Sequence, residues 1–227
     1  MVIFNKIKHG VVSLFYTNYF GLKIKYKAKR NPILQRKIRD EYCTTLLKYL
    51  NVEVNVKNPE KIPEKGQYLV VINHRGILDP LITEIALEKS NIHGDWVAKE
   101  ELAKSFFFGT FVRHAGTILL NRNNKNSNEF FKRIKEVLKD GRSIYIFPEG
   151  TRNKTEKELI EFKGGANLIA LKNRLDILPI YIQNNSGKIL NNTFDNSNKQ
   201  VANVIVGDII PYKERKLEDK YKEQFNL

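Results

Sequence analysis

Hydrophobic and polar positions follow two alternating spacings along the chain. From residue 52 onward, short apolar or β-branched runs alternate with stretches in which apolar residues recur every three or four positions. The predicted strands are Val52–Val56, Tyr68–Ile72, Trp96–Ala98, Thr117–Leu120, Ser143–Phe147, Ile177–Ile182 and Val201–Val206. The predicted helices are Leu81–Lys89, Glu100–Phe111, Ser127–Lys139 and Glu158–Lys172. This alternation predicts an α/β fold, a single domain with a central mixed, largely buried β-sheet flanked by helices.

The segments outside this alternating region carry other patterns. The Asn-rich stretch at residues 184–200 predicts a loop or hairpin, and the tail from Lys213 onward predicts a charged, exposed helix. In residues 1–50, apolar side chains recur at helical spacing, namely Phe4, Ile7, Val11, Leu14 and Phe15. We therefore expect a basic, amphipathic N-terminal helical segment at residues 1–50 and a domain at residues 51–227.

The charge of the chain is concentrated in that N-terminal segment. The net charge is +14 at pH 7, and residues 1–50 carry eleven Lys and Arg against two acidic residues, Asp40 and Glu41. A surface this basic attracts nucleic acid, anionic lipid or an acidic partner, and charge alone does not choose among them. The helical segment either docks its apolar face on the protein's own core or lies in a membrane interface with its lysines at the head groups.

Composition excludes several classes of protein. A length of 227 residues suits one globular domain that buries its core without disulfides or structural metal. The single cysteine, Cys43, excludes a disulfide framework and is expected to fill space, and four scattered histidines make a metal site unexpected. The longest apolar stretch, Val11–Tyr16, is far shorter than the roughly 20 residues that a membrane span needs. Neither a span nor a secretory signal is therefore expected.

A histidine and an aspartate follow the second predicted strand. His74 and Asp79 are five positions apart, about 140° apart on a straight helix, so they can meet only if the chain bends between them. Gly76 permits such a bend. A paired histidine and aspartate is typical of general-base chemistry. The alternative is that His74 is a polar group at a strand end and that Asp79 caps a helix whose first residue is Pro80.

Cationic and small residues follow other predicted strands. Ser143–Phe147 runs into Pro148-Glu149-Gly150-Thr151-Arg152, where glycine stands beside a hydroxyl and a guanidinium. Lys163 lies beside two glycines, and Arg122 follows another strand. Each cation alone is most often a solvated surface charge. Three of them at strand or loop ends of an open α/β sheet predict an anion site.

These blocks together resemble those of a known family. Asn73-His74-x4-Asp79 and Phe147-Pro148-Glu149-Gly150-Thr151-Arg152 resemble the motifs of the glycerolipid acyltransferases, specifically the 1-acyl-sn-glycerol-3-phosphate acyltransferases of the PlsC/AGPAT type. The resemblance runs from about Val52 to Val206 and includes Ala98-Lys99-Glu100-Glu101-Leu102 and Phe162-Lys163-x-Gly165. The chain departs from the family at Asn121, where Asp is common, and at Tyr181, where a small apolar residue or a second proline is usual.

The resemblance implies an acyl transfer that needs no cofactor. His74 is implied to accept the proton of a lipid hydroxyl while Asp79 orients the imidazole, and the hydroxyl then attacks a thioester directly. The implied donor is acyl-CoA or acyl carrier protein, the acceptor is lysophosphatidic acid, and the product is phosphatidic acid. The residues implied at the acceptor phosphate are Arg122, Glu149, Gly150, Thr151, Arg152 and Lys163, with Glu149 orienting their loop. Further candidates for substrate contact are Asn73 and Lys99.

The expected setting is a membrane surface. The basic N-terminal segment predicts peripheral or monotopic binding to anionic phospholipid at the cytoplasmic face of the cell membrane. No nucleic-acid partner is expected, because the sequence contains no glycine-rich RNA motif or recognition-helix pattern. Two alternatives stay open. One is an acyltransferase for another lysophospholipid or for glycerol-3-phosphate, and the other is a basic, non-catalytic protein that binds membranes or nucleic acid.

Overall fold

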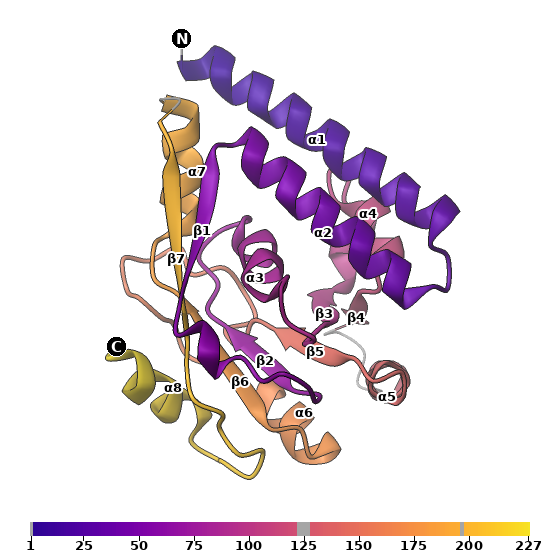
Figure 1. Ribbon diagram of the computed structural model, residues 1–227, viewed down its shortest axis with the longest axis vertical. Coiled ribbons are helices and arrows are strands. Elements are labelled where there is room, and N and C mark those ends of the chain that lie inside the picture. Colours follow the sequence, from indigo (N-terminus) through magenta and orange to yellow (C-terminus); the bar gives the residue numbers. More distant parts are fainter. Residues whose placement is uncertain (1, 122–127, 196–197) are drawn as a thin grey trace.

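The computed structural model describes residues 2–121, 128–195 and 198–227, which form a seven-stranded mixed sheet between helices (Figure 1). The strands are β1 (Val52–Lys57), β2 (Leu69–Ile72), β3 (Gly94–Lys99), β4 (Ile118–Leu120), β5 (Ser143–Ile146), β6 (Ile177–Ile182) and β7 (Gln200–Val206). Their order is β1-β7-β6-β2-β5-β3-β4. The strands from β6 to β4 are parallel to one another, whereas β7 is antiparallel to β6 and β1 is parallel to β7. The predicted mixed α/β fold is confirmed.

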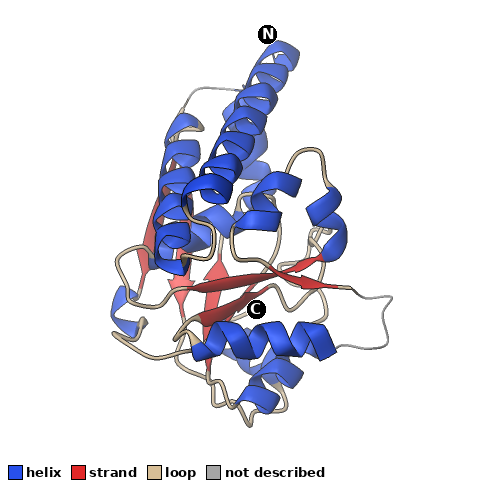
Figure 2. Ribbon diagram, turned by 90° about the vertical axis from the view of Figure 1, so that its right-hand side faces the viewer, coloured by secondary structure: helices blue, strands red, loops and turns tan. Residues whose placement is uncertain are grey.

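Helices cover both faces of this sheet (Figure 2). The α-helices are α1 (Val2–Lys27), α2 (Pro32–Tyr49), α3 (Asp79–Leu87), α4 (Gly109–His114), α5 (Asn128–Lys139), α6 (Gly165–Asn173), α7 (Ser186–Asp195) and α8 (Leu217–Phe225), and the 3-10 helices are η1 (Pro59–Lys61) and η2 (Glu100–Lys104). Buried residues of α1, α2, α3 and α7 belong to one apolar core, and those of α5, α6 and α8 belong to another. The sheet separates these two cores.

The central strands explain where the functional side chains gather. Every residue of β2, β5 and β6 is buried, which is typical of parallel strands covered on both faces. Along β2, Val70 and Ile72 face the first core, and Leu69 and Val71 face the second. Because these three strands are parallel, their carboxyl ends meet at one edge of the sheet. The segments that follow them are therefore neighbours although they are far apart in the sequence.

One predicted helix is divided in two. The sequence predicts a continuous helix over Glu100–Phe111, but the chain forms η2 and α4 with a turn between them. The hydroxyl of Ser105 accepts hydrogen bonds from the backbone amides of Phe107 and Phe108, each at 3.2 Å. A serine side chain that bonds to nearby amides in this way closes a turn and ends a helix.

Another predicted helix begins later than expected. The sequence predicts a helix over Glu158–Lys172, but α6 begins at Gly165. The side chain of Glu158 accepts hydrogen bonds from Arg75 at 2.6 Å and from Tyr181 at 2.7 Å. These long-range contacts hold the residues before α6 as an irregular loop, so tertiary bonding overrides the local helical spacing.

The C-terminal third corrects two further predictions. The expected loop or hairpin at residues 184–200 contains α7, whose first turn is capped by Asn185: its Oδ1 accepts from the amides of Gly187 and Lys188 at 3.0 and 3.1 Å. The expected exposed helix after Lys213 is α8, which is charged on one side only. Its residues Leu217, Tyr221 and Phe225 recur every four positions and are buried in the second core.

α1 is apolar on two opposite sides. Its inner side packs against α2 and α4, where Phe20, Gly21 and Ile24 are buried. A Cβ at Gly21 would lie 2.8 Å from the backbone nitrogen of Phe111, so only glycine allows this close approach of α4. The outer side, which we call the apolar stripe, consists of Ile3, Phe4, Ile7, Val11, Phe15, Tyr19, Leu22 and Tyr26.

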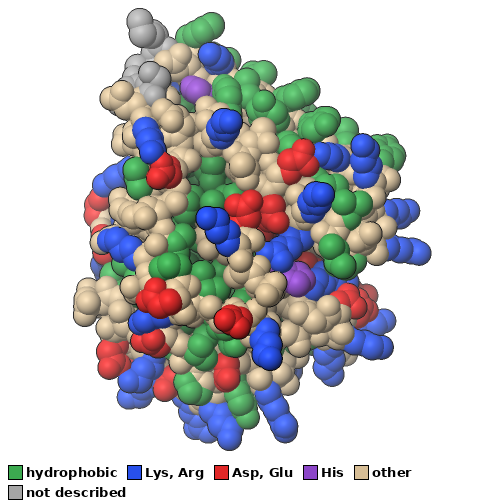
Figure 3. Space-filling model, in the orientation of Figure 1, with side chains coloured by type: hydrophobic (Ala, Val, Ile, Leu, Met, Phe, Trp, Pro, Cys, Tyr) green, Lys and Arg blue, Asp and Glu red, His purple; other side chains and the backbone are tan. Residues whose placement is uncertain are grey.

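The apolar stripe faces away from the protein. Its side chains are between 43% and 75% exposed, and Figure 3 shows apolar side chains along the edge that α1 occupies in Figure 1. Of the two alternatives for this helical segment, docking on the protein's own core does not hold for Phe4, Ile7, Val11 and Phe15, because these side chains are exposed. In the described ranges, no helix combines the length and the apolarity that a bilayer span requires.

A buried ion-pair network joins α2 to the sheet. Arg39, which is 4% exposed, lies 3.1 Å from Glu84 of α3 and 3.6 Å from Asp95 of β3. Its guanidinium also donates to the carbonyl oxygens of Gly94 and Ala115 at 2.7 and 2.9 Å. Burial alone lowers the pKa of Arg39, but Glu84 and Asp95 outweigh it and hold that pKa above its usual value. The helical pair at the N-terminus is thus fixed to the strand layer by charge as well as by packing.

Candidate active site

His74 and Asp79 meet in the turn between β2 and α3. The Nδ1 atom of His74 lies 2.8 Å from Asp79 Oδ2, and the same oxygen accepts from the amides of Arg75 and Gly76 at 2.7 and 2.8 Å. The chain bends at Gly76, where a Cβ would overlap the Ser186 hydroxyl. Asp79 is fully buried, and His74 is partly exposed. The chain therefore has the bend that contact between His74 and Asp79 requires.

The helix-capping alternative for Asp79 is not what the structure shows. Asp79 is itself the first residue of α3, with Leu78 before it as the capping residue. Its carboxylate reaches back to the turn that carries His74 instead of forward to the first amides of the helix. Asp79 thus holds the turn that carries His74, residues 73–78, which we call the histidine turn.

An aromatic stack forms one wall of the site. The ring of Phe147, which follows β5, lies on the imidazole of His74 with centroids 3.9 Å apart and planes 10° apart. The ring of Phe147 also stacks on the ring of Trp96 of β3, with centroids 4.9 Å apart. The indole nitrogen of Trp96 donates to Glu84 at 2.9 Å, which fixes the stack to α3. Phe147 belongs to the second sequence motif, but its contact with the first could not be read from spacing.

The second motif and the residue directly after it hold the backbone of His74 on both sides. The amide of His74 donates to Glu149 Oε1 at 2.6 Å, and its carbonyl oxygen accepts from the amide of Asn153 at 2.7 Å. Glu149 Oε2 accepts from the amide of Ile160 at 3.1 Å. Burial raises the pKa of Glu149 to about 7, although these two amide bonds favour its charged form. Glu149 therefore positions the histidine turn.

This arrangement changes the role expected for two motif residues. Both oxygens of Glu149 already accept backbone amides, so its predicted place among the phosphate-binding residues is not supported, whereas its predicted role in orienting the loop agrees with these bonds. The Gly150 amide donates to the carbonyl of Phe147 at 3.0 Å, and its φ of +67° is one that glycine adopts without strain. Gly150 thus shapes the turn after β5.

Asn73 is occupied within the fold. It is 1% exposed, its amide nitrogen donates to the carbonyl of Ile182 at 3.0 Å, and its oxygen accepts from the Ile182 amide at 2.8 Å. The Asn73 backbone amide donates to the hydroxyl of Tyr221 at 3.3 Å. The side chain ties the end of β2 to the end of β6, so the expected substrate contact is not supported.

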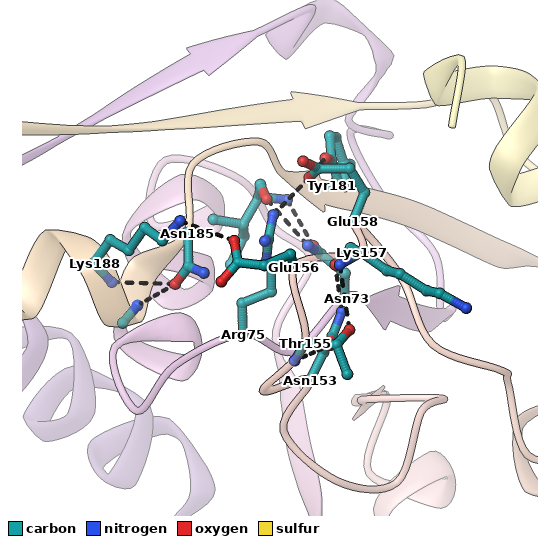
Figure 4. Close-up of polar contacts among 12 residues, drawn as sticks. Asn73, Arg75, Asn153, Thr155, Glu156, Lys157, Glu158, Tyr181, Asn185 and Lys188 are labelled. Carbon is teal, nitrogen blue, oxygen red and sulfur yellow. Dashed lines mark hydrogen bonds and ion pairs between the residues drawn. The ribbon is translucent and has the colours of Figure 1, made fainter.

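The loop between β5 and α6 is held against the histidine turn by polar side chains (Figure 4). Glu158 accepts from Arg75, whose side chain is 5% exposed, and from the hydroxyl of Tyr181. Within the loop, Asn153 accepts from the amide and hydroxyl of Thr155 at 2.9 and 2.7 Å. Tyr181 is one of the two positions at which the sequence departs from the resembled family, and it here supplies one of the two donors to Glu158.

The remaining predicted residues lie around this loop. Thr151 and Arg152 are exposed directly after Gly150, and Lys163 is exposed near its end, 3.3 Å from Glu161. Lys99 ends β3 at the same edge of the sheet and is partly exposed. Arg122 lies outside the described residues. The convergence of the three cations on one phosphate stays a prediction.

The geometry suits proton transfer at an imidazole. A histidine whose Nδ1 proton is held by a buried carboxylate has its lone pair on Nε2, where it can accept a proton. Cys43 is buried in α2 within the first core, and burial raises the pKa of its thiol well above the usual range. A buried thiol of this kind is unreactive. The chemistry of the site therefore centres on His74.

Comparison with known proteins gives a consistent result. A family described as acyltransferase matches residues 53–183. A Helicobacter pylori protein named 1-acyl-sn-glycerol-3-phosphate acyltransferase is 41% identical over 137 residues, which are 59% of this chain and 56% of that protein. A Borreliella burgdorferi protein of the same name is 33% identical over 152 residues, which are 66% of this chain and 59% of that protein. The chain thus spans little more than half the length of these curated relatives.

The fold has a solved counterpart. The crystal structure of the 1-acyl-sn-glycerophosphate acyltransferase PlsC from Thermotoga maritima superposes with a TM-score of 0.68 and covers 98% of this chain and 90% of its own. The two sequences are 22% identical, so the similarity concerns the fold. It extends over the N-terminal helices as well as the sheet, because nearly the whole chain is covered.

Proposed function

Because the chain belongs to the acyltransferase family, we propose that it transfers a fatty acyl chain from an acyl thioester to the free hydroxyl of lysophosphatidic acid, which yields phosphatidic acid for phospholipid synthesis. The observation that carries this proposal is the contact between His74 Nδ1 and the buried Asp79 carboxylate at 2.8 Å. The names of the relatives support the choice of acceptor. The donor is acyl-CoA or acyl carrier protein, and no other cofactor takes part.

The reaction follows from the chemistry of the pair. His74 Nε2 accepts the proton of the acceptor hydroxyl as the oxygen attacks the thioester carbonyl carbon, and positioned bases of this kind contribute about 10²–10⁴-fold to the rate. Asp79 holds the Nδ1 proton and stabilises the imidazolium that forms. When the tetrahedral intermediate collapses, the carbon–sulfur bond breaks and the thiolate takes the proton from His74. The acyl group is then an ester on the acceptor, and the free thiol leaves.

The acceptor phosphate requires counter-charge near this base. A phosphate monoester carries about −1.5 to −2 charges, and removing it from water is costly unless cations and hydrogen-bond donors replace the solvent. The exposed Arg152 and Lys163 lie on the loop that holds the His74 turn. We assign the phosphate to these residues and to Arg122, with Thr151 as a further donor. Lys99, at the neighbouring strand end, is a further candidate for substrate contact.

The substrate is a membrane lipid, so the site must reach a bilayer. The apolar stripe of α1 exposes eight apolar side chains on one side of the helix. Lysines accompany it, including the exposed Lys6, Lys8, Lys25 and Lys27. An exposed apolar helix face with adjoining lysines supports peripheral or monotopic binding to anionic lipid. We accordingly place the protein at the cytoplasmic face of the cell membrane.

The test is release of thiol by the purified chain with defined donors and acceptors. Acyl-CoA and acyl carrier protein are each supplied with lysophosphatidic acid, another lysophospholipid, glycerol-3-phosphate or monoacylglycerol in vesicles. We expect thiol release and phosphatidic acid with lysophosphatidic acid, and loss of both in His74→Ala. The matched control is His93→Ala, since His93 lies before β3 and bonds to its own loop at Asn91.

Each outcome separates the proposal from its alternatives. Faster turnover of another lysophospholipid or of glycerol-3-phosphate would replace the acceptor but keep the reaction class. Thiol release that His74→Ala retains would remove His74 as the base. Absence of release with every donor and acceptor, in the presence of vesicle binding, would favour a non-catalytic membrane protein.

A further inference from the structure

We propose that Ser186 is a positioning residue for His74, acting through the carboxylate of Asp79. This inference rests on the proposed function of His74 as the base. Ser186 is the first residue of α7, in the Asn-rich region where the sequence predicts no helix, and it lies beyond the residues matched by the family. Neither the motifs nor the comparisons therefore assign it a role.

The contact is direct and buried. The hydroxyl of Ser186 donates a hydrogen bond to Asp79 Oδ1, and both residues are fully buried. The other carboxylate oxygen, Oδ2, receives His74 Nδ1 and the amides of Arg75 and Gly76. Four donors thus surround the carboxylate, three on one oxygen and Ser186 on the other.

The distribution of donors explains why the serine matters. A carboxylate turns about the bond between Cβ and Cγ as a rigid planar group, so a hydrogen bond that restrains Oδ1 also restrains Oδ2. The Ser186 hydroxyl holds Oδ1, so the plane of the carboxylate is fixed and with it the direction in which Oδ2 faces His74. Charge-assisted hydrogen bonds to a buried carboxylate are short and strong, which suits them to this task.

Ser186 is itself held in place by the start of α7. Asn185 caps the helix through bonds to the amides of Gly187 and Lys188, and Figure 4 shows its side chain turned toward this first turn. The Asn185 carbonyl accepts from Ile189 at 2.9 Å. The hydroxyl is therefore presented by a capped helix within the fold.

Two glycines allow α7 to approach the histidine turn this closely. A Cβ at Gly76 would overlap the Ser186 hydroxyl and would lie 2.6 Å from the Gly187 nitrogen. A Cβ at Gly187 would lie 3.3 Å from the Arg75 carbonyl oxygen. The close packing and the hydrogen bond therefore occur at the same point.

The experiment compares Ser186→Ala with a matched loss of a buried hydroxyl on the same helix. Thr193 is 6% exposed and donates to the carbonyl of Leu190 at 2.7 Å, so Thr193→Ala removes a similar group at a distance from Asp79. Ser186→Cys keeps the side-chain volume but offers only a weak donor, and it serves if Ser186→Ala folds poorly.

Two readouts are measured on the full chain. In steady-state kinetics with acyl-CoA and lysophosphatidic acid, we expect Ser186→Ala to lower kcat by about 10-fold while KM for both substrates stays within about 2-fold, as outer partners of reacting groups typically do. Ser186→Cys should fall between, and Thr193→Ala should keep the wild-type kcat. In proton NMR, the Nδ1 proton of His74, identified by its absence in His74→Gln, should be sharp in wild type and in Thr193→Ala and broadened in Ser186→Ala.

The outcomes separate this inference from the proposed function. A wild-type kcat in Ser186→Ala, a rise in KM alone, or a kcat loss shared by Thr193→Ala would overturn the positioning role. A lower kcat with an unchanged His74 resonance would overturn it too, since Ser186 would then act elsewhere. If wild type transfers no acyl group, the proposed function fails, and the NMR comparison alone decides whether Ser186 holds the pair.

Discussion

The ring of Phe147 lies nearly parallel to the imidazole of His74, with their centroids 3.9 Å apart. This contact joins two sequence motifs that are about 70 residues apart, because Phe147 opens the block that ends in Arg152. Glu149 from the same block and Asn153 directly after it bond to the His74 backbone on both sides. The two motifs therefore act as one unit in which the second holds the first.

Replacement of Phe147 should slow the reaction without weakening substrate binding. Aromatic contacts of this kind are worth about 0.5–1.5 kcal/mol beyond their buried area, so Phe147→Leu should free the imidazole to tilt and lower kcat by up to about 10-fold. Steady-state kinetics measure the effect, with Phe131→Leu on α5 as the control. Equal losses in the two variants would show that the stack serves stability alone.

The stability of the protein should depend on the ionisation of Glu149. Its pKa is raised from 4.5 to about 7 by burial, so the folded state binds more protons than the unfolded state between these values. The free energy of unfolding contributed by this group is then fully present below about pH 4.5 and falls as pH rises toward about 7. Thermal unfolding from pH 4 to 8 should show this loss in wild type relative to Glu149→Gln.

The comparison with Glu149→Gln removes the contribution of other titrating groups. Asp40, whose pKa burial raises to about 6, titrates in the same window and is common to both proteins. The glutamine cannot ionise, so the stability advantage of wild type should shrink across the window and stay constant above it. A difference in Tm that does not change with pH would show that Glu149 keeps an ordinary pKa.

Part of the site follows from the sequence because its causes are local. Asn73 and His74 directly follow a strand whose apolar run is long enough to identify, and Gly76 allows the bend that brings Asp79 to the imidazole. The parallel arrangement of strands then predicts that the segment after Ser143–Phe147 lies beside it. Local spacing and strand order thus suffice for the pair and for its neighbouring loop.

The remaining features depend on contacts that have no local signal. Ser186 meets Asp79 across more than a hundred residues, and nothing in an Asn-rich stretch indicates which serine will face a carboxylate. Glu149 lies in a motif with cations, which suggests a phosphate site, but burial turns it toward two backbone amides instead. The apolar stripe of α1 cannot be distinguished by spacing from a face that packs on the core, because both sides of the helix are apolar.

Removal of the buried guanidinium at Arg39 should destabilise the protein strongly. Arg39→Ala leaves the buried carboxylates of Glu84 and Asp95 with less counter-charge, and breaking a buried ion pair typically costs about 3–5 kcal/mol. Arg36→Ala on the same helix removes a partly exposed pair with Asp40 and hydrogen bonds to the carbonyls of Glu88 and Ser90, and it should cost only about 1–2 kcal/mol. Denaturant unfolding measures both variants, and similar losses would show that the network contributes no more than a surface pair.

Arg152 should be required for an acceptor that carries a phosphate. A planar guanidinium binds two phosphate oxygens at once and lysine offers one point charge, so Arg152→Lys should raise KM for lysophosphatidic acid by about 10-fold or more despite keeping the charge. It should leave a neutral monoacylglycerol acceptor, if one is used, nearly unaffected. Kinetics with both acceptors are the measurement, and Lys154→Arg is the control at an exposed neighbouring position. Equal losses on both acceptors would assign Arg152 to the fold or to the donor site.

The apolar stripe of α1 should provide the salt-resistant part of membrane binding. Phe4, Ile7 and Phe15 are 61% to 71% exposed, and burial of such a side chain is worth about 1.5–3 kcal/mol. The triple change to serine should therefore lower the share of protein that floats with anionic phosphatidylglycerol vesicles by at least about 10-fold in high salt.

Salt separates the two contributions to that binding. Lysine attraction to anionic lipid is screened within about 8–10 Å at ordinary ionic strength, so high salt should weaken wild-type flotation and leave the part that insertion provides. The matched control is Leu171→Ser, which removes a 58% exposed apolar side chain from α6 on the other side of the sheet and should float as wild type does. If the triple variant of α1 keeps its flotation in high salt, the stripe does not contact lipid, and the surface that brings His74 to its substrate must lie elsewhere.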